Sequence, residues 1–393
     1  MRVECGDGVA LTRELVRIDS RNPSLVPGGP GEGEIARVLR DVLVSWGFDV
    51  ELRDAAPGRP NVVARVGTPG SRTLMFNGHV DVVGVEEMTH SPWASEIDRD
   101  GRIYGRGSSD MKAGVASMCA AAARVASTTM RGEIIVAAVV DEEYASAGTR
   151  ALLADGVRAD AAIVAEPTGL AIMPAHRGFV WIDVTTHGRA AHGSRWDIGV
   201  DAICHAGLVL AELDRMDREE LPRRSHPLLG RPSVHASLIE GGSGMSTYPE
   251  RCTVRIERRT IPGETPEQVC SEIGTLCDRV RSTHPELRAD VSMVLAQKPS
   301  DVAADAPIVV RLGDAMREEG LDVRIEGMSA WTDAALLNDA GIPAVCFGPG
   351  NMALAHANEE WVVVDEIERA TRVLARLATQ WCGSDSADVH AGS

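Results

Sequence analysis

Two adjacent glutamates, Glu142 and Glu143, follow an apolar run that is typical of a buried strand, and Asp141 precedes them. Three consecutive carboxylates repel one another, so they need either solvent or cations around them. A solvated acidic turn at the start of a helix is the ordinary explanation. A metal site is the alternative, and it requires further ligands elsewhere in the chain.

Further acids and histidines lie at the ends of other expected strands or in the loops after them. They are His79 and Asp81 in NGHVDVV, Asp110 in GRGSSDMKAG, Glu166 in VAEPTG and His356 in ALAHANEEW. Because ligands bind at the carboxyl ends of strands in an open α/β sheet, these side chains are expected to share one site. Histidine with Asp and Glu, without cysteine, suits zinc or a similar divalent ion in a catalytic setting.

Each of these residues also has an ordinary structural explanation. His79 and Asp81 are two apart on a strand, so the Asp81 carboxylate is expected to accept the second ring N–H of His79, with or without a metal. Asp110 would otherwise be a helix N-cap. Glu166 would otherwise belong to a surface turn, and His356 would be an unremarkable loop histidine. The five segments together favour the metal site.

The elements that must position these residues alternate between strands and helices. Short apolar runs at NVVARV, TLMFNGHVDV, EIIVAAVV and DAAIVAE are separated by helical patterns, including the alanine-rich MKAGVASMCAAAARVAS. The alternation predicts an α/β catalytic domain with a mainly parallel sheet and helices on both faces. Between residues 178 and 296 the order becomes β-α-β-β-α-β, which predicts an inserted α+β ferredoxin-like domain.

We therefore expect a catalytic domain in two parts, 1–177 and 297–383, an inserted domain at 178–296, and a disordered tail at 384–393. The net charge of −17 argues against nucleic acid or an anionic membrane as a partner. No segment resembles a signal peptide or reaches the roughly 18 apolar residues of a membrane helix. With eight scattered cysteines and no CxxC pair, the expectation is a cytoplasmic protein with reduced thiols.

Taken together, the motifs resemble a family of dinuclear zinc hydrolases. This family includes acetylornithine deacetylase, succinyl-diaminopimelate desuccinylase, aminoacylase and the carboxypeptidase G type. The resemblance covers essentially the whole chain, in the family's order. Its segments are FNGHVDVV, YGRGSSDMKAG, VVDEEYASAGT, VAEPTG, GRAAHGS, RRTIPGET and GIPAVCFGPG…AHANEEW.

The resemblance implies two divalent metal ions about 3.5 Å apart, with zinc as the expected metal and cobalt as a substitute. Asp110 would bridge the two ions, and Glu142 would bind neither and act as the general base. Asp81 would assist catalysis as the partner of a metal-bound histidine. The remaining ligands would be His79 and Glu166 for one ion, and Glu143 and His356 for the other.

The resemblance also implies that the inserted domain is a lid that dimerises. His192 would help to hold the scissile carbonyl oxygen in a neighbouring subunit's site, and Arg259 would pair with a substrate carboxylate. Arg258 is interpreted as a solvated charge on the opposite strand face. Ser246 stands where many relatives carry Asn, which leaves the substrate contact at that turn open.

The function implied is metal-dependent hydrolysis of the amide bond in an N-acyl amino acid or a similar small carboxylate-bearing amide, by a homodimer. One alternative is a dipeptidase or carboxypeptidase with the same site. The other is a relative that binds a ligand without catalysis. The presence of the base and all five ligands argues against that second alternative.

Overall fold

The computed structural model describes residues 3–69, 72–126 and 130–383, which form two compact units. The first unit comprises Met1–Pro174, Val302–Glu326 and Thr332–Ser393. The second comprises Ala175–Asp301 and Gly327–Trp331. The expected insertion, 178–296, falls within the second unit. The expected disordered tail lies outside the described residues.

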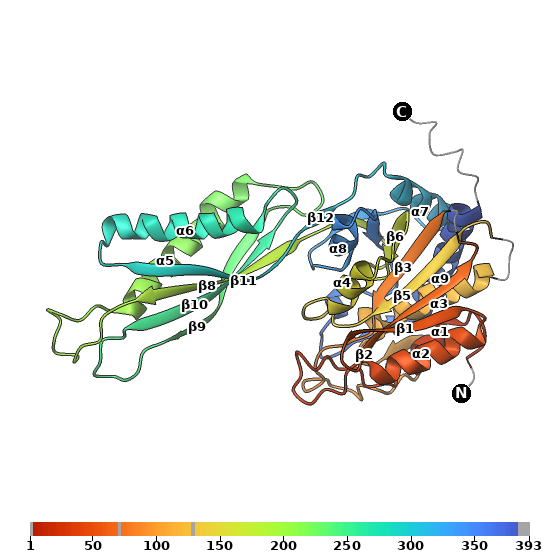
Figure 1. Cartoon of the computed structure of the whole chain (residues 1–393), viewed down its shortest axis with the longest axis horizontal. Helices are drawn as coiled ribbons and strands as arrows, with labels where there is room; N and C mark the ends of the chain where they lie inside the picture. Colours follow the sequence, from red (N-terminus) through yellow and green to blue (C-terminus); the bar gives the residue numbers. More distant parts are fainter. Residues whose placement is uncertain (1–2, 70–71, 127–129, 384–393) are drawn as a thin grey trace. The chain divides into compact units, whose positions relative to one another are not determined.

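The first unit is built on a sheet whose central strands are parallel (Figure 1). In the order β5-β3-β6-β14 every neighbouring pair is parallel, whereas the flanking pairs β1-β2, β2-β5 and β14-β7 are antiparallel. β5 is buried along its whole length, as its continuous apolar sequence indicates. The strand bounds are β1 Asp49–Ala56, β2 Arg59–Gly67, β3 Thr73–His79, β5 Glu133–Val139, β6 Ala161–Val164, β7 Ile172–His176 and β14 Ala344–Cys346.

Helices cover both faces of this sheet. In Figure 1, α3 and α9 lie on one side of the strands, and α4 and α8 lie on the other. The alanine-rich α3 is buried almost all round, because its small side chains let α9 and β3 approach closely. The helix bounds are α1 Gly8–Val16, α2 Gly33–Ser45, α3 Ala113–Ala126, α4 Ala147–Ala154, α7 Pro307–Glu318, α8 Ala334–Asp339 and α9 Val364–Gly383.

The second unit has the order β8-α5-β9-β10-α6-β11, and its sheet runs β11-β8-β10-β9 with every pair antiparallel. The alternation along β8 and β10 places Val180, Ile182, Val184, Val254 and Ile256 in the core with the helices. The opposite face carries polar and aromatic side chains. The bounds are β8 Gly178–His187, α5 Ala202–Arg215, β9 Ser233–Gly241, β10 Arg251–Thr260, α6 Pro266–Thr283 and β11 Arg288–Gln297.

Short elements complete the chain. The strands are β4 Arg102–Tyr104, β12 Ser300–Asp301, β13 Ile325–Met328 and β15 Trp361–Val363, and the helical turns are η1 Ser108–Lys112, η2 Met216–Glu220, η3 Leu221–Arg223 and η4 Met352–Leu354. The predicted class is confirmed: a mainly parallel α/β sheet covered on both faces, with a ferredoxin-like α+β unit. Among the described residues, no helix has the length and apolar character needed to cross a bilayer.

Candidate metal centre

Most of the candidate ligands follow strands of the parallel part of the sheet. His79 is the last residue of β3, Glu143 follows β5, Glu166 follows β6, and His356 lies in the loop after β14. Asp110 lies in η1. Carboxyl ends of parallel strands meet at one edge of a sheet, so the topology brings these residues of distant sequence position to one place.

The five side chains form two groups that share Asp110. The ligand atoms of His79, Asp110 and Glu166 lie within 4.8 Å of one another, as do those of Asp110, Glu143 and His356. The two oxygens of Asp110 face different histidines: Oδ1 is 3.1 Å from His79 Nε2, and Oδ2 is 3.5 Å from His356 Nε2. This is the arrangement that a carboxylate bridging two cations requires.

The electrostatics of the cluster fit two divalent ions. Burial raises the pKa of Glu166 to about 8 and also raises the pKa of Glu143, with Asp110 adding to both shifts. The Glu143 Oε1 atom is buried and has no hydrogen-bond partner among the described residues. Carboxylates crowded in this way need positive charge, and the donor set of imidazole and carboxylate suits zinc and related metals.

Both histidines of the cluster are paired with its carboxylates. His356 Nε2 lies 2.9 Å from Glu143 Oε2, and this hydrogen bond raises the pKa of His356 to about 9. Burial lowers the pKa of His79, but the hydrogen bond to Asp110 and the nearby carboxylates outweigh it, so the pKa lies well above its usual value. Metal binding would displace both protons, because a ligating imidazole nitrogen must be deprotonated.

The expected hydrogen bond between the His79 ring and the Asp81 carboxylate is wrong in detail. His79 Nδ1 donates to the Asp81 backbone carbonyl at 3.0 Å, while the carboxylate lies farther away, at 3.6 Å. The carboxylate instead accepts the backbone N–H groups of Glu142 and Glu143, each at 3.2 Å, and the Asn22 amide at 2.8 Å. The spacing rule of a strand does not apply to this pair, because β3 ends at His79 and Asp81 lies beyond it. Asp81 therefore orients both the ring and the two glutamates.

Glu142 belongs to neither ligand group. Its Oε2 lies 3.9 Å from His79 Nε2, and its side chain is 10% exposed. Burial and the charges of Glu166, Asp333 and Glu143 raise its pKa well above the usual value. A carboxylate with a raised pKa beside a ligand cluster is suited to accept a proton and to hand it on.

Asp141, to which the sequence assigned no role, anchors the turn that carries the glutamates. It is 3% exposed, has a left-handed φ of 67°, and forms an ion pair of 2.8 Å with Arg59. Its backbone carbonyl accepts N–H groups from residues 144–146. A non-glycine residue held in this conformation by its surroundings fixes the direction of the following residues.

Glu360 was not predicted from the sequence, although its carboxylate binds the backbone of the loop that contains Asp110. Its fully buried carboxylate accepts from the Arg106 guanidinium at 2.7 Å and from the N–H groups of Gly107, Ser109 and Asp110 at 2.9–3.0 Å. Gly107 has φ 79°, and a Cβ there would meet Val82 Cγ1 at 2.6 Å. The acidic residues of AHANEEW are visible in the sequence. No sequence pattern, however, indicates that one of them contacts the distant segment GRGSSD.

Asp333 is a second buried carboxylate that the sequence did not single out. It is 1% exposed, and Thr149 donates a hydrogen bond of 2.6 Å to its Oδ2. Burial raises its pKa to about 6, and its charge contributes to the raised pKa values of Glu142 and Glu166. The hydroxyl of Thr149 thus ties Asp333, at the start of α8, to α4.

The remaining predicted residues lie in the second unit. His192 is exposed and its Nδ1 contacts the Ser194 hydroxyl at 2.9 Å, and Ser246 is exposed in the adjacent turn. Arg259 is partly exposed, with its Nε bonded to Glu257 at 2.6 Å. The interpretation of Arg258 as a solvated charge is wrong: its side chain is 1% exposed and pairs with Glu264 at 2.6 Å. Strand alternation explains this, since Arg258 faces the helices.

The parallel sheet, the ferredoxin-like insertion and two ligand groups sharing one carboxylate define an α/β metallohydrolase. Residues 75–380 match the sequence profile of Peptidase family M20/M25/M40, and the chain belongs to this family. The resemblance inferred from the motifs is confirmed. The chain is therefore a hydrolase of amide or peptide bonds.

Three relatives illustrate the range of the similarity. The chain is 31% identical over 355 residues to acetylornithine deacetylase of Myxococcus xanthus, with 87% of this chain and 90% of the relative covered. It is 30% identical over 407 residues to the N-formyl-4-amino-5-aminomethyl-2-methylpyrimidine deformylase of Bacillus subtilis, with 95% and 94% covered. A tripeptidase structure from Staphylococcus aureus shares the fold, with a TM-score of 0.79, 20% identity, and 98% and 100% covered.

Proposed function

We propose that this hydrolase removes the acyl group from an N-acyl amino acid or a similar small amide that carries a carboxylate. The proposal rests on a difference in position among the four carboxylates. Asp110, Glu143 and Glu166 lie in the two ligand groups, whereas Glu142 lies beside them and in neither. The sequence relatives include a deacetylase and a deformylase, which both cleave an acyl group from an amine.

The proposed ligand assignment follows the two groups. His79 and Glu166 would hold one ion and Glu143 and His356 the other, with Asp110 between them. Bound there, two divalent ions would lower the pKa of a water molecule towards neutrality and polarise the substrate carbonyl. We favour zinc as the native metal, with cobalt as a substitute, because the donors are imidazole and carboxylate without thiolate.

Glu142 is the proposed general base. Because it lies beside the ligand groups and belongs to neither, its carboxylate would be free to take a proton from the attacking water and then donate that proton to the nitrogen of the departing amine. Asp81 positions it through the hydrogen bond to the Glu142 backbone N–H. The net result is a carboxylic acid and a free amine, with the proton carried by one side chain throughout.

Two residues of the second unit have proposed substrate roles. His192 would donate a hydrogen bond to the carbonyl oxygen as negative charge develops there. Arg259 would pair with the substrate carboxylate, since its bond to Glu257 uses Nε and leaves the terminal nitrogens for a fork-shaped contact. Ser246 offers only a short hydroxyl in this region.

We further propose a cytoplasmic homodimer that associates through the second unit. Ile203 and Ile239 are 43% and 56% exposed, and β9 is the edge strand of its sheet. An exposed apolar edge of this kind favours pairing with a second copy. Sedimentation would test the dimer independently of activity.

A substrate panel on metal-reconstituted enzyme tests the proposed reaction. N-acetyl, N-formyl and N-succinyl amino acids should be hydrolysed in preference to dipeptides, which the dipeptidase or carboxypeptidase alternative would favour. Glu142→Gln should lower kcat by about 10²–10⁴-fold because the base is lost. Turnover of this variant near the wild-type rate would exclude Glu142 as the base. Preferential cleavage of dipeptides would replace deacylation with peptidase activity.

A further inference from the structure

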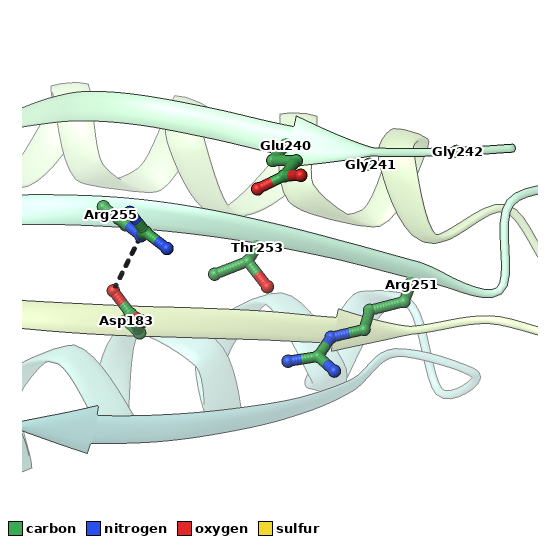
Figure 2. Close-up of a pocket in the computed structure, with 7 residues that line it drawn as sticks. All are labelled: Asp183, Glu240, Gly241, Gly242, Arg251, Thr253 and Arg255. Carbon is green, nitrogen blue, oxygen red and sulfur yellow. Dashed lines mark ion pairs between the residues drawn. The ribbon is translucent and has the colours of Figure 1, made fainter.

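The helices of the second unit leave one face of its sheet open, and one end of that face is polar. Residues alternate along β10, so Arg251, Thr253 and Arg255 point to the open face, while Cys252 and Val254 between them are buried against the helices. Figure 2 shows the open face from the front, with the helices behind the strands. The polar side chains at this end therefore lie outside the core of the unit.

The pairing of the strands places short side chains between longer ones at this end. Thr253 lies opposite Thr185 of β8, and their hydroxyl oxygens are 3.0 Å apart. On its other side Thr253 lies opposite Glu240 of β9. Arg251 and Arg255 flank Thr253 at two positions in either direction along β10. The long side chains and Thr253 line a hollow of about 380 Å³, a volume in the range of small-ligand sites.

Two of the four charged side chains that line this hollow are left unpaired. Arg255 Nε lies 3.7 Å from Asp183 Oδ1, which is the ion pair drawn in Figure 2. Among the described residues, the side chains of Arg251 and Glu240 form no ion pair or hydrogen bond. Because Glu240 lies opposite Thr253, it is a diagonal neighbour of Arg251, with the Cα atoms about 7–8 Å apart. An unpaired cation and an unpaired anion thus stand on two sides of one hollow.

We propose that this hollow binds a free α-amino acid in its zwitterionic form. The Arg251 guanidinium holds the carboxylate through a fork-shaped contact, and Glu240 accepts from the ammonium group. The lining charges balance, so a neutral zwitterion meets no net repulsion. A phosphate would instead face two carboxylates, and a simple amine would face two guanidinium groups. The inference goes beyond the proposed function, since no residue of the hollow is a metal ligand, the base or a proposed substrate contact.

Calorimetric titration of the metal-free full chain tests the proposal. L-Alanine should bind, whereas propionate and ethylamine should bind at least about 10-fold more weakly, because each lacks one of the two charged groups. Arg251→Gln and Glu240→Gln should each weaken L-alanine binding by a similar factor. Arg288→Gln is the matched control, since Arg288 is an exposed arginine of β11 outside the hollow. The affinity of this control for L-alanine should equal that of the wild type.

Several outcomes of these titrations would overturn the proposal. Equal binding of propionate and L-alanine would reduce the hollow to an anion site. Unchanged affinity in Arg251→Gln, or an equal loss in Arg288→Gln, would remove the specific role of Arg251. Loss of L-alanine binding in Arg259→Ala would place the amino acid at the proposed substrate anchor instead.

Sedimentation distinguishes the amino acid from a second copy of the chain as the partner of these charges. Arg251→Gln should leave the oligomeric state unchanged. Dissociation of a dimer by this substitution would show that Arg251 pairs with another copy, and it would overturn the proposal. Binding is measured here without metal or turnover, so failure of the substrate panel would refute the proposed function and leave this test intact.

Discussion

Removing Glu360 should weaken both the fold and the metal site, although Glu360 is not a ligand. Its carboxylate is fully buried and accepts four hydrogen bonds, one from the Arg106 guanidinium and three from the backbone of the Asp110 loop. Glu360→Ala leaves a guanidinium that is 6% exposed without its counter-charge, together with three N–H groups without an acceptor. The lost ion pair and the three unsatisfied N–H groups together determine how far the free energy of unfolding falls.

Breaking a buried ion pair from one side costs about 3–5 kcal/mol. Counting each unsatisfied N–H separately at about 1–3 kcal/mol would give more. Relaxation of the loop and entry of water offset part of that sum, so we expect about 3–5 kcal/mol in total. For a unit of this size, the melting temperature of the metal-free protein should fall by roughly 6–20 °C.

The second effect of Glu360→Ala is on metal affinity. In this variant the Asp110 backbone N–H loses its acceptor, so the proposed bridging carboxylate is no longer held in position. Loss of such support lowers metal affinity by about 10- to 100-fold. Scanning calorimetry and competition with a chelator measure the two effects. Glu359→Ala is the matched control, since Glu359 is exposed and its carboxylate contacts Thr89 at 3.5 Å. Equal melting temperatures and metal affinities in both variants would refute the reasoning.

Three further predictions concern other parts of the account. Because the metal-free pKa of His356 is raised to about 9 by Glu143 and that of Glu166 to about 8 by burial, protons compete with the metal below these values. Cobalt affinity measured by calorimetry should therefore rise from pH 6 to about 9 and then level off, and a flat profile would contradict this. Arg258→Ala should destabilise the protein by about 1.5–3 kcal/mol in denaturant unfolding, whereas Arg259→Ala should raise KM with little change in stability. Asp81→Asn should lower kcat by about 10- to 100-fold, since Oδ1 and Oδ2 of Asp81 each accept one glutamate N–H and the variant replaces one of these oxygens with an NH2 donor. An unchanged kcat would remove Asp81 from its positioning role.

The class of fold followed from the sequence because its signals are local. The apolar run of β5 and the alternation of β8 and β10 each indicate a strand and its buried face within a few residues. The antiparallel edge strand β1 was not singled out, because its sequence DVELRDAA is mostly polar and its place depends on pairing with β2.

The candidate ligands were also visible, since each follows an expected strand or glycine-rich loop. What the sequence could not show was which buried charges support them. Glu360 and Arg106 are 254 positions apart, and Asp333 meets Thr149 across 184 positions. Arg258 and Arg259 are adjacent and chemically identical, and only the orientation of β10 makes one a buried ion-pair partner and the other an accessible cation.

The stoichiometry of bound metal tests the central claim most directly. After reconstitution with zinc and removal of excess metal, elemental analysis should find two ions per chain in the wild type and in Glu142→Gln. Asp110→Ala, which removes the carboxylate common to both ligand groups, should lose both ions, whereas Glu166→Ala should lose one. Two retained ions in Asp110→Ala, or loss of metal in Glu142→Gln, would contradict the division between bridging ligand and free base.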